Sequence, residues 1–174
     1  MTGKAITRCF AAAFFSLLLG QYATAQEAKV SGAKIVWYGV YKVGESKEVP
    51  DKSSPTGTRL LSSGIIPPST SSDRIPAVLG TRFGVGYVLE GGPPGAQAKV
   101  RHVRLFPPGG IVNSKTGQRA DSLDVELSYP VDTKDLFLGY PFRESFELVP
   151  GVWTFQVWNG SRKLLEKQFT VYRP

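Results

Sequence analysis

The stretch that most constrains the fold is the end of the chain, residues 147–172, whose pattern predicts a β-hairpin. Asn159-Gly160 lies between two runs rich in β-branched and aromatic residues, and Asn-Gly is typical of a type I′ turn with positive φ at both positions. Successive side chains point to opposite faces of a strand. One face of this hairpin is therefore expected to form the floor of a hydrophobic core, made of Trp153, Phe155, Val157, Phe169 and Val171.

One residue breaks this alternation, because Lys167 falls on the apolar face of the second strand. A β-bulge near Glu166 would move it to the other face. Alternatively, the lysine lies at the edge of the sheet and extends its amine to solvent. The sequence leaves both explanations open.

The remainder of the chain repeats short β-rich runs separated by clusters of proline and glycine, and it has no long segment with helical periodicity. This pattern predicts an all-β fold, an antiparallel immunoglobulin-like β-sandwich of about seven strands. Besides the hairpin, strands are expected over 28–43, 82–90, 98–106, 122–129 and 141–148, short edge strands over 58–62 and 74–78, a loop over 111–120, and a connector over 130–140 with one turn of helix after Asp132.

The first 25 residues have the features of a cleaved secretory signal peptide. Lys4 and Arg8 precede an apolar run over 9–19 that is too short to span a bilayer, and Ala23-Thr24-Ala25 is a typical cleavage site. We expect a mature chain that begins at Gln26, forms a single domain over 26–174 and is periplasmic or secreted, with no transmembrane segment.

Export would also remove the only cysteine and lower the net charge from +7 to +5. The mature chain would then contain no disulfide and no thiol nucleophile. Its charge is only moderately basic, and aromatic residues do not alternate with the basic ones as in proteins that bind single-stranded nucleic acid, so no nucleic-acid partner is expected.

The segment Leu148-Val149-Pro150-Gly151 resembles the L-x-P-G corner of fibronectin-type-III-like domains. In those domains an aromatic residue fixes the corner, and Trp153 would take that place here, although the usual residue is tyrosine and the spacing is one residue shorter. An ordinary Pro-Gly turn is the alternative explanation.

A wider resemblance covers most of the mature chain. Residues 80–85, Pro107-Pro108, residues 147–155 and residues 164–171 resemble an exported bacterial family known as domain of unknown function 3859. These matching pieces are structural in character. The resemblance implies an immunoglobulin-like fold and no particular activity.

The residues offer little support for catalysis. His102 is the only histidine, no G-x-S-x-G motif is present, and no group of ligands has the spacing of a metal site. His102 is therefore expected to be structural or exposed, and we expect no catalytic residue, cofactor or metal. Asp124 and Glu126 share one face of a predicted strand, so a glycan hydrolase using these two carboxylates is an alternative. Otherwise they are solvent-facing residues that pair with the neighbouring basic strand.

Four residues are candidates for binding. Arg101 and Arg104 belong to the most basic predicted strand, which would suit an anionic surface or glycan. Tyr38 and Tyr140 would offer a patch for a sugar or peptide if both were exposed, although aromatic residues of this kind more often belong to the core.

The sequence thus favours a non-enzymatic, exported module that binds or scaffolds a partner in the cell envelope: a protein, a glycan or an anionic surface. The alternatives are the hydrolase and an assembly or chaperone-like module that offers a sheet edge to another chain. A carboxylate pair in a cleft would favour the hydrolase, and a long, uncharged, unpaired edge strand would favour the assembly module.

Overall fold

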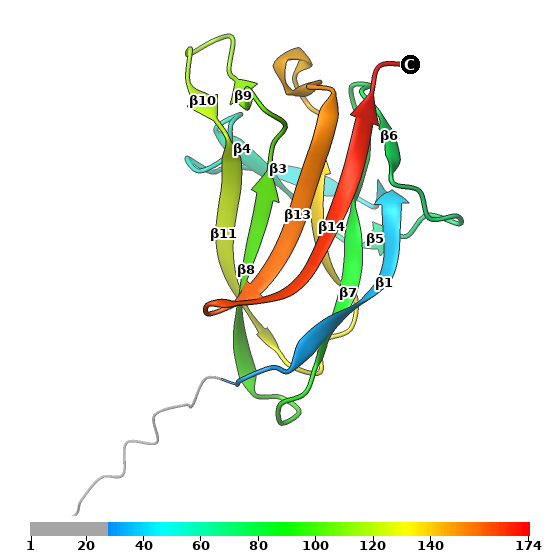
Figure 1. Ribbon diagram of the computed structural model, residues 1–174, viewed down its shortest axis with the longest axis vertical. Helices are drawn as coiled ribbons and strands as arrows, with labels where there is room; N and C mark the ends of the chain where they lie inside the picture. The colour runs from blue at the N-terminus through cyan, green and yellow to red at the C-terminus, as the bar shows by residue number, and fades with distance from the viewer. Residues whose placement is uncertain (1–27) are drawn as a thin grey trace, which may run out of the picture.

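The computed structural model describes residues 28–174, which form a β-sandwich of two facing sheets (Figure 1). One sheet has three strands in the order β1-β7-β12, and the other has five in the order β11-β8-β13-β14-β6. Neighbouring strands in both sheets are antiparallel, except that β14 and β6 run parallel. The predicted fold class is confirmed. The strands are β1 (Gly32–Val40), β7 (Arg82–Glu90), β12 (Leu136–Pro141), β11 (Ser122–Pro130), β8 (Gln97–Leu105), β13 (Gly151–Asn159), β14 (Arg162–Tyr172) and β6 (Arg74–Pro76).

Within residues 28–174, three two-stranded sheets are formed by segments outside the two main sheets. The pairs are β2 (Lys42–Val43) with β5 (Ile65–Ile66), β3 (Ser46–Pro50) with β4 (Thr58–Ser62), and β9 (Ile111–Val112) with β10 (Arg119–Ala120), and a 3-10 turn, η1, spans Ser145–Glu147. The edge strands expected over 58–62 and 74–78 are present as β4 and β6. The strands β3 and β5 were not predicted, and the loop expected over 111–120 contains the paired strands β9 and β10. Their polar or very short sequences carry no alternating pattern.

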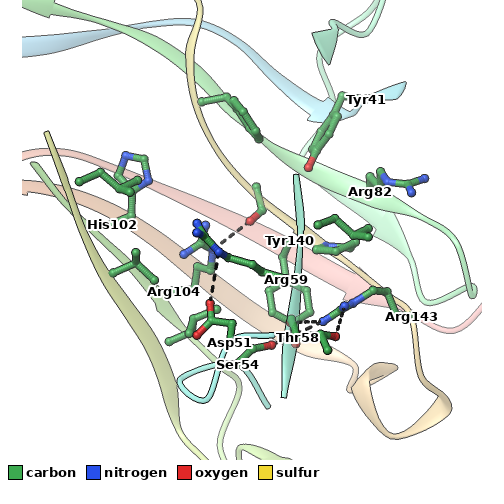
Figure 2. Close-up of a pocket in the computed structure, with 17 residues that line it drawn as sticks. Tyr41, Asp51, Ser54, Thr58, Arg59, Arg82, His102, Arg104, Tyr140 and Arg143 are labelled. Carbon is green, nitrogen blue, oxygen red and sulfur yellow. Dashed lines mark hydrogen bonds and ion pairs between the residues drawn. The ribbon is translucent and has the colours of Figure 1, made fainter. Parts of the chain in front are cut away.

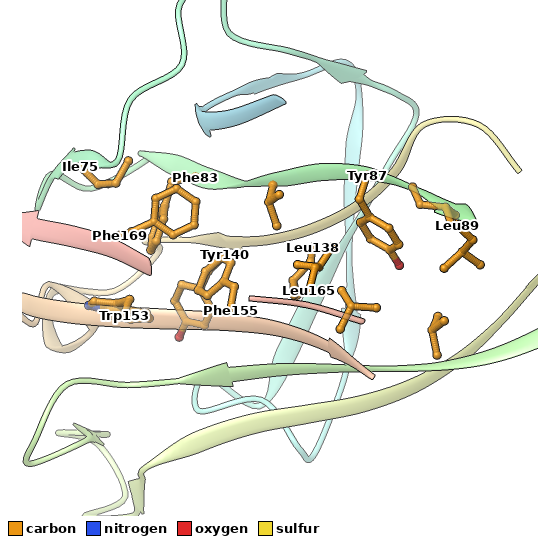
Figure 3. Packing of buried hydrophobic residues seen from close by; sticks show 14 of the residues in the cluster. Ile75, Phe83, Tyr87, Leu89, Leu138, Tyr140, Trp153, Phe155, Leu165 and Phe169 are labelled. Carbon is orange, nitrogen blue, oxygen red and sulfur yellow. The ribbon is translucent and has the colours of Figure 1, made fainter. Parts of the chain in front are cut away.

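Phe83 of β7 is the centre of the core between the two sheets (Figure 3). Its ring centroid lies 5.3 Å from that of Phe155 and 5.3 Å from that of Phe169, both in the opposite sheet. It also lies 5.6 Å from Trp153. The five residues predicted as the floor of the core are all buried, so the predicted inward face of the C-terminal hairpin is confirmed.

The turn of this hairpin differs from the prediction. Asn159 pairs with Arg162, so the two-residue loop consists of Gly160 and Ser161. Only Gly160, with φ 55°, has a positive φ in this loop. Glycine at the first of two loop positions is typical of a type II′ turn. The predicted type I′ turn at Asn159-Gly160 is therefore wrong by one residue, because Asn159 completes the strand.

Lys167 remains on the inward face, opposite Phe155. Its Nζ lies 3.8 Å from the centre of the Tyr38 ring and 3.8 Å from a carboxylate oxygen of Asp73. The bulge in β14 is located at Leu164, where the register with β13 shifts, and it does not reverse Lys167. The lysine therefore places its stem along the apolar layer and its amine among polar and aromatic groups at the edge.

The predicted positions of the connector and the strand within residues 130–148 were wrong. The expected connector contains β12 (Leu136–Pro141), and the expected strand over 141–148 is mostly an irregular segment with the turn η1. Asp132 does not begin a helical turn, since its carboxylate accepts a hydrogen bond from the backbone N–H of Gly95 at 3.0 Å. Asp132 and Asp135 favoured a helical cap in this segment, so the short alternation that begins at Leu136 was not recognised as a strand.

Glycines on the outer face of β7 allow close approach. The indole of Trp37 lies against Gly86, where a Cβ atom would be only 2.0 Å from the indole nitrogen. At Gly84, a Cβ atom would lie 2.4 Å from the carbonyl oxygen of Leu138 in the adjacent strand. Glycine is required at both positions because any side chain would displace a neighbour.

The corner before β13 is held by Trp153. Its Nε1 donates a hydrogen bond to the backbone carbonyl of Val149 at 2.9 Å, while its ring is fully buried. This is the pinning role expected from the resemblance to L-x-P-G corners, performed by an indole. Trp153 therefore couples the corner directly to the core.

Candidate functional site

A pocket at one side of the sandwich arises because the two sheets differ in width. β1 contacts β14 and β6, so the three-stranded sheet covers that end of the five-stranded sheet. At the other end β11 extends beyond β12. Its inward side chains Leu123, Val125 and Leu127 are consequently only half-buried. Their partial exposure marks the open side of the core.

The β3–β4 hairpin lies over this open side and completes a pocket of about 160 Å³ (Figure 2). Contributions come from both sheets and from the hairpin. The pocket is lined by Tyr41, Asp51, Ser54, Thr58, Arg59, Leu60, Arg82, His102, Arg104, Leu123, Val125, Leu127, Phe137, Gly139, Tyr140, Pro141 and Arg143. Four of these residues are arginines and only one is a carboxylate, so the pocket is strongly cationic next to an apolar wall.

Arg104 extends from the inner face of β8 to the edge of β12. Its Nε donates a hydrogen bond to the carbonyl of Gly139 at 2.9 Å. Its Nη1 is buried and has no hydrogen-bond partner among residues 28–174. Burial lowers the pKa of Arg104 to about 10, so the guanidinium stays charged at neutral pH. A buried donor without a partner is costly and is uncommon in folded proteins, which makes Arg104 the most informative residue of the pocket.

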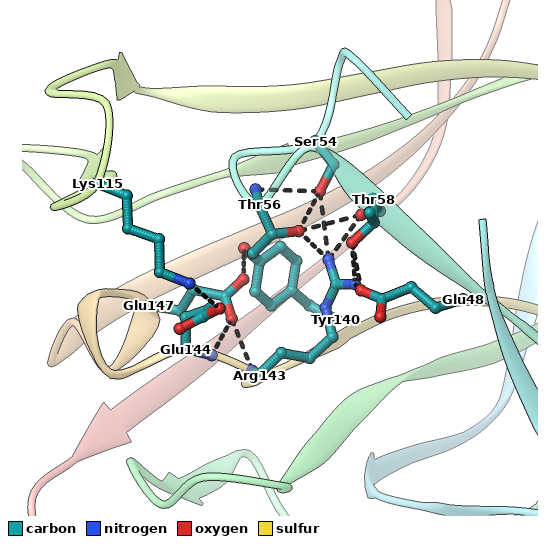
Figure 4. A network of polar contacts seen from close by, with 9 residues as sticks. All are labelled: Glu48, Ser54, Thr56, Thr58, Lys115, Tyr140, Arg143, Glu144 and Glu147. Atoms are coloured by element: carbon teal, nitrogen blue, oxygen red, sulfur yellow. Dashed lines mark hydrogen bonds and ion pairs between the residues drawn. The ribbon is translucent and has the colours of Figure 1, made fainter. Parts of the chain in front are cut away.

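Arg143 belongs to the same lining, and its two terminal nitrogens are used by the β3–β4 hairpin (Figure 4), whereas its buried Nε has no hydrogen-bond partner among residues 28–174. It donates to the Glu48 carboxylate at 2.8 Å and to the hydroxyl of Thr58 at 2.7 Å, and it also contacts the hydroxyl of Thr56. On the other side, Glu144 pairs with Lys115 at 2.7 Å. The hydrogen bonds of Arg143 fix the hairpin over the pocket. They occupy its terminal nitrogens, so only Nε remains as a donor for a ligand.

The remaining charges lie nearer the opening. Arg59 is exposed and lies 4.0 Å from Asp51. A hydrogen bond from the hydroxyl of Ser53 lowers the pKa of Asp51, so that carboxylate is ionised at neutral pH. Within the described part of the chain, Arg82 makes no ion pair with a carboxylate. The pocket therefore has one arginine paired with a carboxylate at its opening and two cations, Arg82 and Arg104, with no carboxylate of the described residues at ion-pair distance.

His102 was expected to be either structural or exposed, and it is a buried structural residue. It is 2 % exposed, and its Nε2 lies 2.6 Å from the hydroxyl oxygen of Tyr87. Burial, with a smaller effect of the Arg104 charge, lowers the pKa of His102 to about 3. The imidazole is neutral at physiological pH and adds no charge to the pocket.

This depressed pKa predicts acid sensitivity. The unfolded chain binds a proton at His102 below about pH 6.5, whereas the folded chain resists it down to about pH 3, so stability decreases as pH falls through this window. We expect this residue alone to remove roughly 2 kcal/mol by pH 5. Chemical denaturation at pH 7 and pH 5 measures the loss. In His102→Leu the difference between the two pH values should shrink by that amount, and an unchanged difference would contradict the prediction.

The structure brings two of the four predicted binding residues together, because Arg104 and Tyr140 both line the pocket. Arg101 is instead on the outer face of the same strand as Arg104, 3.3 Å from Asp124 and over the ring of Trp158. Tyr140 is 3 % exposed and donates a hydrogen bond to Glu147 at 2.6 Å, so it is a core residue. Tyr38 packs against Lys167 at the far edge of the sandwich. A patch shared by Tyr38 and Tyr140 is therefore absent from the described surface.

The carboxylates of the hydrolase alternative lie outside the pocket. Asp124 and Glu126 are exposed on the outer face of β11, and Asp124 pairs with Arg101 across the strands as the simpler explanation anticipated. They form no pair in a cleft. Asp124 and Glu126 also lie on β11, the long strand at the edge of the five-stranded sheet. The assembly alternative requires an uncharged edge strand, and β11 is charged.

Several lining residues had no recognisable pattern in the sequence. Arg59 and Asp51 lie in the Ser- and Pro-rich stretch that gave few structural indications, and Arg82 and Arg143 lie at the boundaries of segments. They meet only because the hairpin folds back over β12. Arg104 was the one indication of the pocket in the sequence. It is on the same face of β8 as the inward apolar residues, and this position places a charge in the core layer.

Two further properties concern the described residues as a whole. Among residues 28–174, no three histidine, cysteine, aspartate or glutamate side chains are grouped so that they could hold a metal ion. The same residues contain no helix of sufficient length and apolarity to cross a bilayer. The predicted signal peptide and Cys9 lie outside the described residues.

Comparison with known proteins agrees with the architecture. A solved structure described as an immunoglobulin-like protein from Pseudomonas aeruginosa is 28% identical in sequence, with a TM-score of 0.60, and the match covers 86% of this chain and 99% of that one. A search of curated proteins gives no significant match. The family model described as "Domain of unknown function (DUF3859)" matches residues 29–171. The match spans nearly the whole described sandwich, and the chain therefore belongs to the DUF3859 family.

Proposed function

We propose that this protein is a non-enzymatic, exported binding module of the cell envelope, and that its binding site is the arginine-lined pocket, which takes an anionic group. The observation that carries the proposal is the buried, unpartnered Nη1 of Arg104 inside a pocket with four arginines and one carboxylate. Buried donors without a partner are costly and uncommon, and strained or unsatisfied groups concentrate at functional sites. A second such donor in the same lining, Nε of Arg143, supports a site for an acceptor. A bound anion would supply the missing acceptor through a charge-assisted hydrogen bond.

The rigid surroundings of the pocket support a binding role. Arg104 is held by Gly139 on the edge of β12, and the hairpin over the pocket is fixed through Arg143. Pre-organised donors bind an anion with little loss of conformational entropy. A non-enzymatic role is supported by the state of the titratable groups in the lining. Its histidine is bonded to Tyr87, and burial raises the pKa of Tyr41 to about 12, so both are neutral at physiological pH.

The simplest test uses acetate as the probe and the Nε–H signals of the arginine side chains in NMR spectra. The signal of Arg104 is expected to shift in a saturable manner on titration with acetate, and Arg104→Gln should abolish acetate binding. Arg101→Gln is the matched control, since it removes an arginine from the outer face of the same strand. Saturation at Arg101 with none at Arg104, or unchanged binding in Arg104→Gln, would contradict the proposed site.

Export is a separate part of the proposal and has its own measurement. N-terminal sequencing of the protein recovered from the periplasm or medium should begin at Gln26, because Ala23-Thr24-Ala25 has the small residues that signal peptidases require. A protein that is found only inside the cell and retains Met1 would contradict export without affecting the pocket.

A further inference from the structure

We infer that the ligand of this pocket is a small monocarboxylate with an apolar body of about the size of a benzene ring or a chain of five to six carbons. This inference rests on the proposed function and specifies the chemistry of the ligand. It depends on three observations: which donors of Arg104 are free, which charges surround them, and what covers the remainder of the wall.

The free donors favour a carboxylate. The Nε of Arg104 is engaged by the carbonyl of Gly139, so the side of the guanidinium that contains Nε is already in use. The unpartnered Nη1 is one of the two terminal nitrogens at the opposite end, which lie in one plane. Two parallel N–H donors match the two oxygens of a carboxylate in a bidentate pair.

The surrounding charges favour a single negative charge. Arg143 is bonded to Glu48 and to the hydroxyl groups of the hairpin, so it adds little free positive charge. Asp51 is an ionised carboxylate in the lining and would repel a second negative charge. Arg82 is the second arginine of the lining without an ion pair among the described residues and adds a positive charge, so the preference for a carboxylate monoanion over a phosphate dianion depends on the small number of free donors and on the Asp51 charge.

The wall beside Arg104 is apolar, because Leu123 of the neighbouring strand β11 is the direct partner of Arg104 on the same face of the sheet. It consists of inward side chains of β11, Leu123, Val125 and Leu127, with Leu60 of the hairpin and Phe137 of β12. Phe137 is 37% exposed, and the three β11 residues are half-buried although they face the core layer. An apolar body placed there would remove this surface from water, which is favourable through the hydrophobic effect.

The volume limits the size of that body. The pocket holds about 160 Å³. An apolar cavity of roughly 150 Å³ in another protein accommodates benzene, so one ring or a short chain fills this pocket and a long acyl chain does not.

Isothermal titration calorimetry with acetate, hexanoate, benzoate and inorganic phosphate tests the inference. We expect hexanoate and benzoate to bind at least tenfold more tightly than acetate, and phosphate to bind no better than acetate. Arg104→Met should remove binding of all carboxylates, and Arg104→Lys should weaken them strongly because a lysine keeps the charge but not the planar pair of donors. Denaturation curves of both variants establish that they fold.

Two further variants test the apolar wall. Val125→Thr keeps the shape of the side chain and replaces one methyl group of the pocket wall by a hydroxyl group, so it should weaken hexanoate and benzoate severalfold and leave acetate nearly unchanged. Val152→Thr is the control, because Val152 is 47% exposed on β13 and does not line the pocket.

The outcomes separate the two levels of the argument. Equal affinities for all four anions, or tightest binding of phosphate, with loss in Arg104→Met would overturn the apolar monocarboxylate and keep the anion site. Benzoate binding that survives in folded Arg104→Met would overturn the pairing with Arg104. No binding of any of the four anions would overturn the proposed function together with this inference.

Discussion

Replacing Trp153 with alanine is expected to lower the free energy of unfolding by about 3–5 kcal/mol, the range typical of a buried tryptophan. The ring is fully buried and lies 4.9 Å from Phe106 and 5.1 Å from Tyr140, so its removal would leave a cavity at the centre of the aromatic cluster. The corner before β13 would also lose the hydrogen bond to Val149. Urea denaturation monitored by circular dichroism measures the change.

Trp153→Phe separates the two contributions. Phenylalanine retains most of the packing but has no donor for the Val149 carbonyl, so we expect a loss between that of wild type and that of the alanine variant. Trp158→Ala is the matched control, because this indole is on the outer face of the same strand and is partly exposed. Equal midpoints for wild type and Trp153→Ala would show that the ring is not part of the core.

The second large effect is expected for Glu147→Ala, which should also destabilise the fold by roughly 3–5 kcal/mol. Glu147 is 1 % exposed, and its carboxylate accepts three hydrogen bonds: from the hydroxyl of Tyr140 at 2.6 Å, from the backbone N–H of Arg143 at 2.6 Å and from that of Glu144 at 2.8 Å. Alanine would leave all three donors without an acceptor in the interior.

Glu147→Gln is the informative comparison, because the amide has the same shape and retains one oxygen acceptor. We expect it to lose about 1–2 kcal/mol, since its amide nitrogen cannot accept from a donor. Thermal unfolding of the two variants beside wild type provides the measurement. If Glu147→Ala were as stable as Glu147→Gln, the carboxylate would not be holding this corner.

The C-terminal hairpin shows how far a sequence pattern can reach. Trp153, Phe155 and Val157 alternate strictly, and local alternation is sufficient to assign them to the core. The turn was displaced by one residue because Asn159-Gly160 matches a turn motif, although Asn159 forms the last pair of the ladder with Arg162. Strong periodicity thus identified the strand and its buried face, while its boundary depended on pairing with the partner strand.

The pocket could not be predicted in the same way, because it depends on contacts between segments that are distant in sequence. Arg104 was recognised as a candidate, but as part of a basic surface. Its inward direction becomes meaningful only when β12 provides the Gly139 carbonyl and the hairpin over 46–62 covers the gap. Arg101 was selected by the same basic composition, and the alternation of the strand places it on the opposite face.

The unequal width of the two sheets has a consequence for evolution within this fold. The hairpin formed by β3 and β4 shares its ladder only with itself, so its length and composition can change without disturbing the hydrogen bonds of either main sheet. Relatives could therefore exchange this one insertion to alter what the cavity admits, while the aromatic interior beneath it stays the same.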